Sequence, residues 1–336
     1  MVLPPPGVRL LAFDDGGMRG LAMLLLLRSV LREFQQEAGL RTLPLPCERF
    51  DIIAGSGTGG LIALLLGRLR LSIDHAIECY ARVVEHVFMQ VKSGGTFKSS
   101  SFDKVLKEIA NRFGEGEDTP LLDSDPFLCR TFVCTREDNG SGGAALRKLR
   151  TYSHPTEHVL PFTLVDAVRA TMGNPTFFKP LSMQNGDSRS TFLDAGDDHC
   201  NPVYDVLEEA RCFYPAQDIA YLLSLGPGTA PTVGENAPRR FIYQMRLPGV
   251  YLPILRHLAD RCDHIASRFR EEHGDLEGKY CRLTPSRLSP DGRILPDQEK
   301  VLEESISQYL AGVYEQVSTF VLAMTNERAA RRDNAR

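Results

Sequence analysis

The sequence predicts an α/β fold of three layers, in which a mostly parallel central sheet lies between helices and is completed by long C-terminal helices. Two observations carry this prediction. Within the first 70 residues, an apolar run, a glycine turn and an apolar helical segment follow one another twice. Near the C-terminus, two stretches repeat apolar residues at steps of three and four, which is the period of a helix that packs one face against a core.

The first strand is expected at Val8–Phe13, an apolar run that stops at a turn of two aspartates and two glycines. The segment from Arg19 to Gly39 is strongly apolar and ends at a glycine, which is typical of a helix C-terminus. A second strand is expected at Phe50–Ala54, before a glycine-rich turn and a helix at Leu61–Leu69. Because strand, turn and helix recur in the same order, we expect parallel strands joined by crossover helices.

The middle of the chain continues to alternate between helical and extended segments. We expect helices at Ser72–Val91, Pro161–Met172 and Asn201–Phe213. Strands are expected at Phe127–Thr135, at Thr191–Leu193, which is short, and at Ile219–Leu225, which is buried. Ser93–Ser101 is expected to be a polar loop, and Gly140–Gly143 a flexible turn before Leu146–Tyr152.

Two long helices are expected after residue 230, each with one apolar stripe, and a polar loop at Pro285–Pro296 separates them. The stripes are Leu255, Leu258, Cys262, Ile265 and Phe269, and then Leu302, Ile306, Tyr309, Val313, Val317 and Phe320. No composition break marks a domain boundary. We therefore expect one domain over residues 1–336, with an α/β core at 1–230 and a helical completion at 231–336.

The composition excludes several classes of protein. With 43% hydrophobic and 24% charged residues the chain is an ordinary globular protein, and a net charge of −4 argues against a nucleic-acid partner. Eight scattered cysteines without a C-x-x-C pair indicate reduced thiols and a cytoplasmic location. Prolines at 4–6 argue against a secretory signal. The densest apolar run, Leu21–Leu27, is much shorter than the roughly 20 residues of a membrane span, which leaves only transient contact with a membrane surface.

Three motifs lie where predicted strands end, and these are the places where open α/β sheets bind ligands. Asp14–Gly20 reads D-D-G-G-M-R-G, Gly55–Gly60 reads G-S-G-T-G-G, and Asp194–Gly196 reads D-A-G. A single glycine turn is commonly only a turn. The three together, each directly after a predicted strand, indicate one candidate site.

These motifs resemble those of the patatin-like phospholipase family, D-G-G-G-x-R-G, G-x-S-x-G and D-G-G/A. Supporting segments match in the same order at Ala167–Phe178, Asp194–Pro202 and Leu223–Gly228, so the resemblance covers nearly the whole chain. The wording of Gly67–Arg70 and the C-terminal helices are most similar to the fungal branch of the family. The resemblance implies a patatin-like αβα fold and an apolar or lipid ligand.

The resemblance also implies roles for the motif residues. In the family, a serine at the centre of the G-x-S-x-G elbow attacks an ester, and the aspartate of D-G-G/A, here Asp194, accepts its proton. The glycine-rich loop presents N–H groups to the developing oxyanion. Matched to this chain, the loop residues are Asp14, Gly16, Gly17, Arg19 and Gly20, and the elbow residues are Gly55, Ser56, Gly57, Thr58 and Gly59. We expect Asp14 and Arg19 to hold the loop in place rather than to contact a substrate.

The sequence departs from the family at two decisive positions. The nucleophile position is Gly57, which has no side chain, and the flanking Ser56 and Thr58 cannot be assumed to replace it. Asp15 stands at the first glycine of the family's loop motif, where a carboxylate would repel an oxyanion by about 4 kcal/mol at a distance of about 4 Å. We therefore expect no ordinary serine-dependent hydrolysis, and a pocket floor enlarged by the missing serine.

The sequence-based hypothesis is non-hydrolytic acid/base chemistry by Asp15 and Asp194 on an apolar lipid or isoprenoid, as in isomerisation, elimination or cyclisation. One alternative is an inactive pseudo-phospholipase that binds lipid or serves in signalling. Another is residual hydrolysis, with water activated by Asp194 or with Ser56 as nucleophile. No cofactor is expected. The run Asp197–His199 is read as a solvated acidic turn rather than a metal site.

Overall fold

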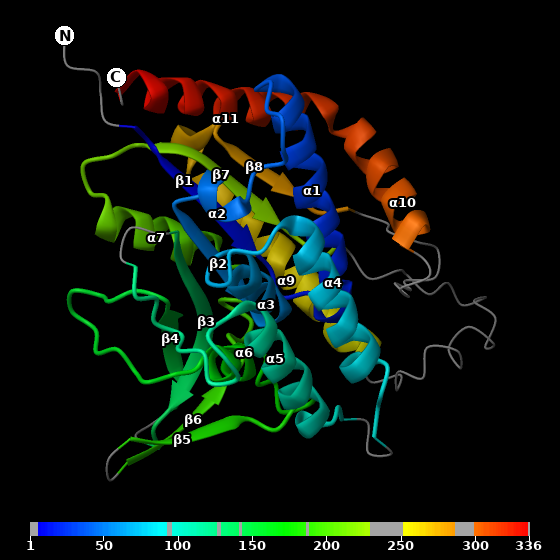
Figure 1. Cartoon of the computed structure of the whole chain (residues 1–336), viewed down its shortest axis with the longest axis vertical. Helices are drawn as coiled ribbons and strands as arrows, with labels where there is room; N and C mark the ends of the chain where they lie inside the picture. The colour runs from blue at the N-terminus through cyan, green and yellow to red at the C-terminus, as the bar shows by residue number, and fades with distance from the viewer. Residues whose placement is uncertain are drawn as a thin grey trace.

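The computed structural model describes residues 6–92, 96–125, 129–140, 143–185, 188–228, 251–285 and 299–334. Parts of five predicted features lie outside these ranges: the loop from Ser93, the strand start at Phe127, the turn Gly140–Gly143, the boundary at residue 230 and most of the loop Pro285–Pro296. Among the described residues, a central sheet has the strand order β5-β6-β3-β2-β1-β7-β8, with β4 paired to β3 (Figure 1).

From β3 to β8 in this order, neighbouring strands are parallel, whereas β4, β5 and β6 form antiparallel pairs. The parallel group consists of β3 (Arg130–Asp138), β2 (Ile52–Ser56), β1 (Val8–Phe13), β7 (Ile219–Leu225) and β8 (Tyr280–Leu283). The antiparallel group consists of β4 (Ala145–Arg150), β5 (Leu181–Asn185) and β6 (Ser188–Leu193). The prediction of a mostly parallel sheet is confirmed, and the predicted bounds of β1 and β7 are correct.

Helices cover both faces of the sheet, because successive side chains of the central strands point to opposite faces. In β1, Leu11 and Phe13 pack into one hydrophobic core, and Leu10 and Ala12 into the other. The first core includes α1 (Gly20–Glu37), α3 (Gly57–Leu66), α4 (Ile73–Val83), η2 (Val84–Phe88), α5 (Ser99–Phe113), α6 (Leu164–Thr171), α10 (Glu299–Gly312) and α11 (Tyr314–Asn334). The second includes α7 (Val203–Phe213) and α9 (Tyr251–Glu272). The result is the predicted three-layer αβα arrangement.

The remaining short helices are α2 (Pro46–Arg49), η1 (Gly17–Arg19) and η3 (Gly274–Leu276). Within the described ranges, no helix combines the length and the apolar character that a bilayer span requires.

Three sequence-based expectations about secondary structure were wrong. The segment 231–336, expected to be helical, also contains a strand, because β8 pairs with β7 in the sheet. This pairing depends on a tertiary contact. The second apolar stripe belongs to two helices, since α10 ends at Gly312, a residue that weakens helices. Ser99–Ser101, expected in a loop, form the first turn of α5.

A buried ion pair fastens the end of β1 to the C-terminal part of the chain. Asp14, the residue after β1, has no exposed surface, and both of its oxygens accept hydrogen bonds from Arg282 of β8 at 2.9 and 2.6 Å. Arg282 also donates to Ser224 of β7 at 3.0 Å and to Asp263 of α9 at 3.0 Å. Burial by itself would lower the pKa of Arg282, but the charge of Asp14 raises it well above its usual range. This network fixes the loop that follows β1.

We expect Arg282→Met to lower the free energy of unfolding by roughly 3 to 5 kcal/mol, because it leaves the Asp14 carboxylate buried without its partner. Urea denaturation followed by circular dichroism measures the change. The matched control is Arg268→Met, which removes a guanidinium that is 59% exposed and should change stability by less than about 1 kcal/mol. Equal effects of the two variants would contradict a special role for the buried pair.

Candidate functional site

The site lies where β1 and β2 end side by side and continue into two glycine-rich turns. In the second turn, Gly57 has a φ of +53°, a left-handed conformation that favours glycine, and it begins α3. Its N–H group donates to Thr171 Oγ1 of α6 at 2.9 Å. A Cβ atom at Gly59 would lie 2.3 Å from the carbonyl oxygen of Asp14, so the two turns touch through their backbones. β2, the turn at Gly57 and α3 therefore form a tight strand–turn–helix connection.

The carboxyl group of Asp15 fills the space beside Gly57. A Cβ atom at position 57 would lie 2.1 Å from Asp15 Cγ and 2.3 Å from each carboxyl oxygen, far inside van der Waals contact. The expectation of an enlarged pocket floor was wrong, because the side chain of Asp15 takes the volume that a side chain at position 57 would need. The two departures from the family pattern thus lie in direct contact with each other.

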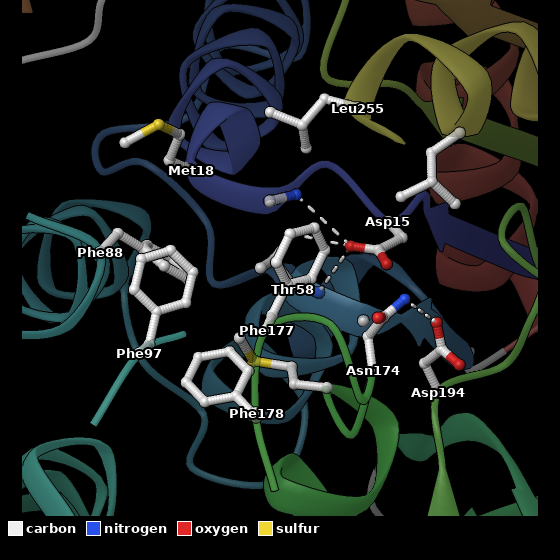
Figure 2. Close-up of a pocket in the computed structure, with 14 residues that line it drawn as sticks. Asp15, Met18, Thr58, Phe88, Phe97, Asn174, Phe177, Phe178, Asp194 and Leu255 are labelled. Atoms are coloured by element: carbon white, nitrogen blue, oxygen red, sulfur yellow. Dashed lines mark hydrogen bonds between the residues drawn. The ribbon is translucent and has the colours of Figure 1, made fainter. Parts of the chain in front are cut away.

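One oxygen of Asp15 accepts all the hydrogen bonds that described residues give to this carboxyl group. Oδ1 accepts from the Thr58 N–H at 3.2 Å, the Thr58 hydroxyl at 3.4 Å and, weakly, the Gly17 N–H at 3.4 Å. Oδ2 accepts from no described residue, and Figure 2 shows it on the side of Asn174 and Asp194. Two backbone donors of the turns, the N–H groups of Gly17 and Thr58, are thus directed at Asp15 rather than left to bind an oxyanion.

The surroundings of Asp15 favour its protonated form. Burial is the largest influence and raises the pKa from its ordinary value of 3.8 to about 6. The hydrogen bond from the Thr58 N–H opposes this rise, and the negative charge of Asp194 adds to it. Asp15 is therefore a carboxyl group that changes its charge near neutral pH.

Asp194, the aspartate of the D-A-G motif, follows β6 and lies in the same cavity. Arg136 Nη2 donates to its Oδ1 at 3.1 Å, and Asn174 Nδ2 donates to its Oδ2 at 2.8 Å. Sequence reasoning missed both partners. Asn174 lies in the segment Ala167–Phe178 that supported the resemblance, whereas Arg136 reaches Asp194 only because β3 pairs antiparallel with β6.

Ser56 does not face the cavity, although Thr58 does. The Ser56 hydroxyl is buried and donates to the carbonyl oxygen of His199 at 2.5 Å. The suggestion that Ser56 replaces the lost nucleophile is therefore wrong for this arrangement. Thr58 lines the cavity, and its Oγ1 accepts the Gly16 N–H at 3.1 Å, which joins the two turns.

The other residues of the glycine-rich loop lie behind the cavity or support it. Asp14 turns away into the ion pair with Arg282. Arg19 is buried and donates to the carbonyl oxygens of Gly228 at 2.6 Å and Leu255 at 3.1 Å, which ties the loop to α9. Gly20 leaves room for the hydroxyl of Tyr80, which donates to the Gly17 carbonyl at 2.5 Å.

The cavity is a mainly apolar space with its carboxyl groups at one end (Figure 2). Its empty volume is about 540 Å³, part of it open to solvent. The described residues that line it are Asp15, Gly17, Met18, Gly57, Thr58, Phe88, Phe97, Met172, Asn174, Phe177, Phe178, Asp194, Leu255 and Leu258. The phenylalanines form a continuous cluster, with ring centroids 5.2 Å apart for Phe88 and Phe97 and 5.3 Å apart for Phe97 and Phe178.

The acidic turn after the D-A-G motif does not gather its side chains around one point. Asp197 pairs with His257 at 2.7 Å, Asp198 pairs with Arg261 at 3.1 Å, and His199 pairs with Asp205 at 3.0 Å. Among the residues that the structure describes, no group of three or more metal-ligating side chains comes together.

Comparisons with known proteins point to one family. The family model for patatin-like phospholipases matches residues 11–205. Calcium-independent phospholipase A2-gamma of Oryctolagus cuniculus is 27% identical over 237 residues, and the alignment covers 66% of this chain and 28% of that protein. The chain thus matches little more than a quarter of that relative's length.

One further relative carries a name that describes it as probably inactive, and one solved structure is only distantly similar. The probable inactive patatin-like protein 9 of Arabidopsis thaliana is 26% identical over 251 residues, covering 69% of this chain and 63% of that protein. The solved structure of VipD from Legionella pneumophila aligns with a TM-score of 0.43 at 10% identity, covering 96% of this chain and 68% of that chain. The latter similarity is too low to support an argument.

The overlap at Gly57 predicts that a serine can be reinstated there only if Asp15 is removed. Gly57→Ser alone should be less stable and should not react with a fluorophosphonate probe, because the new side chain collides with the carboxyl group. The double variant Asp15→Gly/Gly57→Ser should be labelled, since the collision is relieved and the donors of Gly17 and Thr58 are released. Asp15→Gly alone is the control without a nucleophile. Labelling of Gly57→Ser as strong as that of the double variant would contradict the overlap.

The raised pKa of Asp15 predicts a pH-dependent gain in stability for Asp15→Asn. The amide keeps an oxygen for the Gly17 and Thr58 donors and removes the buried charge. The folded-state pKa of about 6 lies above the ordinary value of 3.8, so the unaltered protein loses stability as the pH rises through about 6. The variant should be more stable at pH 8 by at most about 3 kcal/mol, with no difference below about pH 4. Urea titrations by circular dichroism test this, because the chain has no tryptophan. A gain that is the same at both pH values would contradict it.

Proposed function

The chain belongs to the patatin-like phospholipase family, and from its altered site we propose that it carries out non-hydrolytic proton-transfer chemistry on an apolar lipid or isoprenoid. In this proposal it is a degenerate member of the family, with Asp15 and Asp194 as its acid and base. The reaction class is isomerisation, elimination or cyclisation, in which a proton is added to the substrate and a proton is removed, without an external redox partner.

The observation that carries the proposal is the position of Asp15. Its carboxyl group stands where the family's nucleophile side chain would be, and it faces an apolar cavity with a pKa raised by burial to about 6. A carboxyl group of this kind can hold a proton at near-neutral pH and release it to a bound substrate. Binding of an apolar substrate would exclude water and raise that pKa further.

The hydrogen bonds around Asp15 indicate which oxygen would carry the proton. Oδ1 is the acceptor for N–H groups of Gly17 and Thr58, and a protonated oxygen would meet those donors with its own hydrogen. The proton is therefore best accommodated on Oδ2, the oxygen without a donor among the described residues. In Figure 2 this oxygen lies on the side of Asn174 and Asp194, which is the side that a substrate in the cavity would contact.

Asp194 is suited to the complementary role of proton acceptor. One of its oxygens accepts a hydrogen bond from the Arg136 guanidinium and the other from the Asn174 amide, a donor set that suits a carboxylate. In isomerisation or cyclisation, Asp15 protonates an alkene carbon and Asp194 accepts a proton from a carbon next to the cation, so that a new double bond forms. In elimination, Asp15 protonates the leaving group, which departs with that proton when its bond to carbon breaks, and Asp194 accepts a proton from the neighbouring carbon. In each case one proton enters and one leaves.

A ligand-binding protein without chemistry is the second candidate. The similarity to the probable inactive patatin-like protein 9 favours it, as does the absence of a side chain at the nucleophile position Gly57. Residual hydrolysis is the least supported alternative. Ser56 is turned into a hydrogen bond with the His199 carbonyl, and Asp15 takes up the donors that an oxyanion would use.

Three finer predictions from the sequence belong to this proposal. A cytoplasmic location rests on the cysteine usage, and all eight cysteines are free thiols in the structure. Transient contact with a membrane surface would give access to an apolar substrate. Placement in the fungal branch of the family is proposed from the sequence of Gly67–Arg70 and from the C-terminal helices.

The test is to incubate the pure protein with a lipid extract and with the small molecules that co-purify with it, and to search by mass spectrometry for isomers or elimination products. Turnover should fall as the pH rises through about 6, since the acid form of Asp15 is then lost. Asp15→Asn and Asp194→Asn should each reduce turnover by about a hundredfold or more.

The matched control is Asp198→Asn, an aspartate beside the D-A-G motif whose side chain is 84% exposed and does not line the cavity. It should leave turnover unchanged. Unaltered turnover in Asp15→Asn would overturn the proposal, and recovery of every bound molecule without chemical change would favour the binding protein.

A further inference from the structure

We propose that the cavity takes a ligand that bears positive charge in its bound state, embedded in hydrocarbon, and that it disfavours anionic lipids. This inference deepens the proposed function by naming the charge of the ligand. The inference rests on the proposed function only if the positive charge of the ligand arises when Asp15 protonates it in the site.

The first observation is the charge of the cavity wall. Among the described residues that line the cavity, Asp15 and Asp194 are carboxyl groups and none is lysine, arginine or histidine. A ligand in this space therefore meets negative charge at one end and no basic side chain from the described wall. Among these described residues, a bound phosphate or carboxylate would find no cation to replace its lost water.

Two guanidinium groups lie near these carboxyl groups, but neither lines the cavity. Arg136 binds Asp194 at 3.1 Å from the β3 side, and Arg19 binds the carbonyl oxygens of Gly228 and Leu255. Both are directed at protein atoms rather than at the ligand space. They balance the charge of the region as a whole and leave the carboxyl oxygens as the groups nearest to the ligand.

The second observation is the aromatic wall. Phe88, Phe97, Phe177 and Phe178 line the cavity, and Figure 2 shows Phe177 between the other rings and Asp15. The faces of aromatic rings attract cations, and this attraction strengthens when water is excluded. Negative oxygens at one end and aromatic rings along the wall both favour the same kind of ligand.

The remaining wall fits a hydrocarbon chain. Met18, Met172, Leu255 and Leu258 complete the lining with flexible or branched apolar side chains. The expected ligand is therefore amphiphilic, with an apolar body and a cationic centre near Asp15. That centre can be a permanent ammonium group, or a carbocation formed when Asp15 protonates an alkene.

The experiment compares three probes with the same eight-carbon chain, octyltrimethylammonium, octanol and octanoate, by isothermal titration calorimetry at pH 8. The unaltered protein should bind octyltrimethylammonium about tenfold more tightly than octanol, and octanoate no more tightly than octanol. Equal binding of octyltrimethylammonium and octanol, or tighter binding of octanoate, would overturn the inference.

Variants separate the two sources of preference. Asp15→Asn should reduce the preference for the ammonium probe over octanol severalfold by removing a negative charge. Phe177→Leu should reduce it by removing a ring face while keeping an apolar side chain, and circular dichroism confirms that each variant is folded. Asp198→Asn, with its carboxyl group outside the cavity, should leave the preference unchanged. Loss of the preference in Asp198→Asn to the same degree would assign it to general surface charge and overturn the inference.

The two origins of the positive charge give different results. A permanent cation is indicated when an amine co-purifies with the protein, whereas a charge formed in the site is indicated when octyltrimethylammonium competes with turnover of a neutral alkene. Failure of the proposed function would appear separately, as turnover unchanged in Asp15→Asn. That result does not alter the binding preference among the three probes.

Discussion

One steric constraint governs this site: the carboxyl group of Asp15 and a side chain at position 57 cannot occupy the same space. A Cβ atom there would lie 2.1 Å from Asp15 Cγ, and no rotation of a serine side chain moves its Cβ. The carboxyl group of Asp15 can therefore hold its present orientation only while position 57 carries no side chain. The donors of Gly17 and Thr58, the raised pKa of Asp15 and the charge at the end of the cavity all follow from this placement.

The surroundings hold that carboxyl group in place without binding it fully. Asp14 anchors the loop from behind through Arg282, Arg19 ties the loop to α9, and the Thr58 hydroxyl joins it to the elbow. Only one oxygen of Asp15 is engaged by described residues. Asp15 is partly exposed at the cavity, so a ligand can reach its other oxygen. The partial satisfaction is the reason to regard this residue as part of a ligand site.

Much of the fold could be predicted because local patterns determine it. The apolar runs of β1 and β7 end at glycine turns, and their bounds were predicted correctly. The strand β8 was missed, since a four-residue strand is recognisable only by the neighbour it pairs with. In the site, motif spacing located Asp15, Gly57 and Asp194. Arg136 and the aromatic wall come from elements distant in sequence and depend on antiparallel pairing and helix packing that no local pattern records.

The overlap at position 57 also has an evolutionary consequence. In an ancestor that carried a serine there, an aspartate at position 15 could not take the orientation that it has in this structure. With the aspartate in this orientation, a returning serine would require the carboxyl group to turn away. Return to the ancestral site therefore requires changes at both positions, a serine at 57 and a displaced carboxyl group at 15. This requirement hinders return to the ancestral reaction even without selection against it.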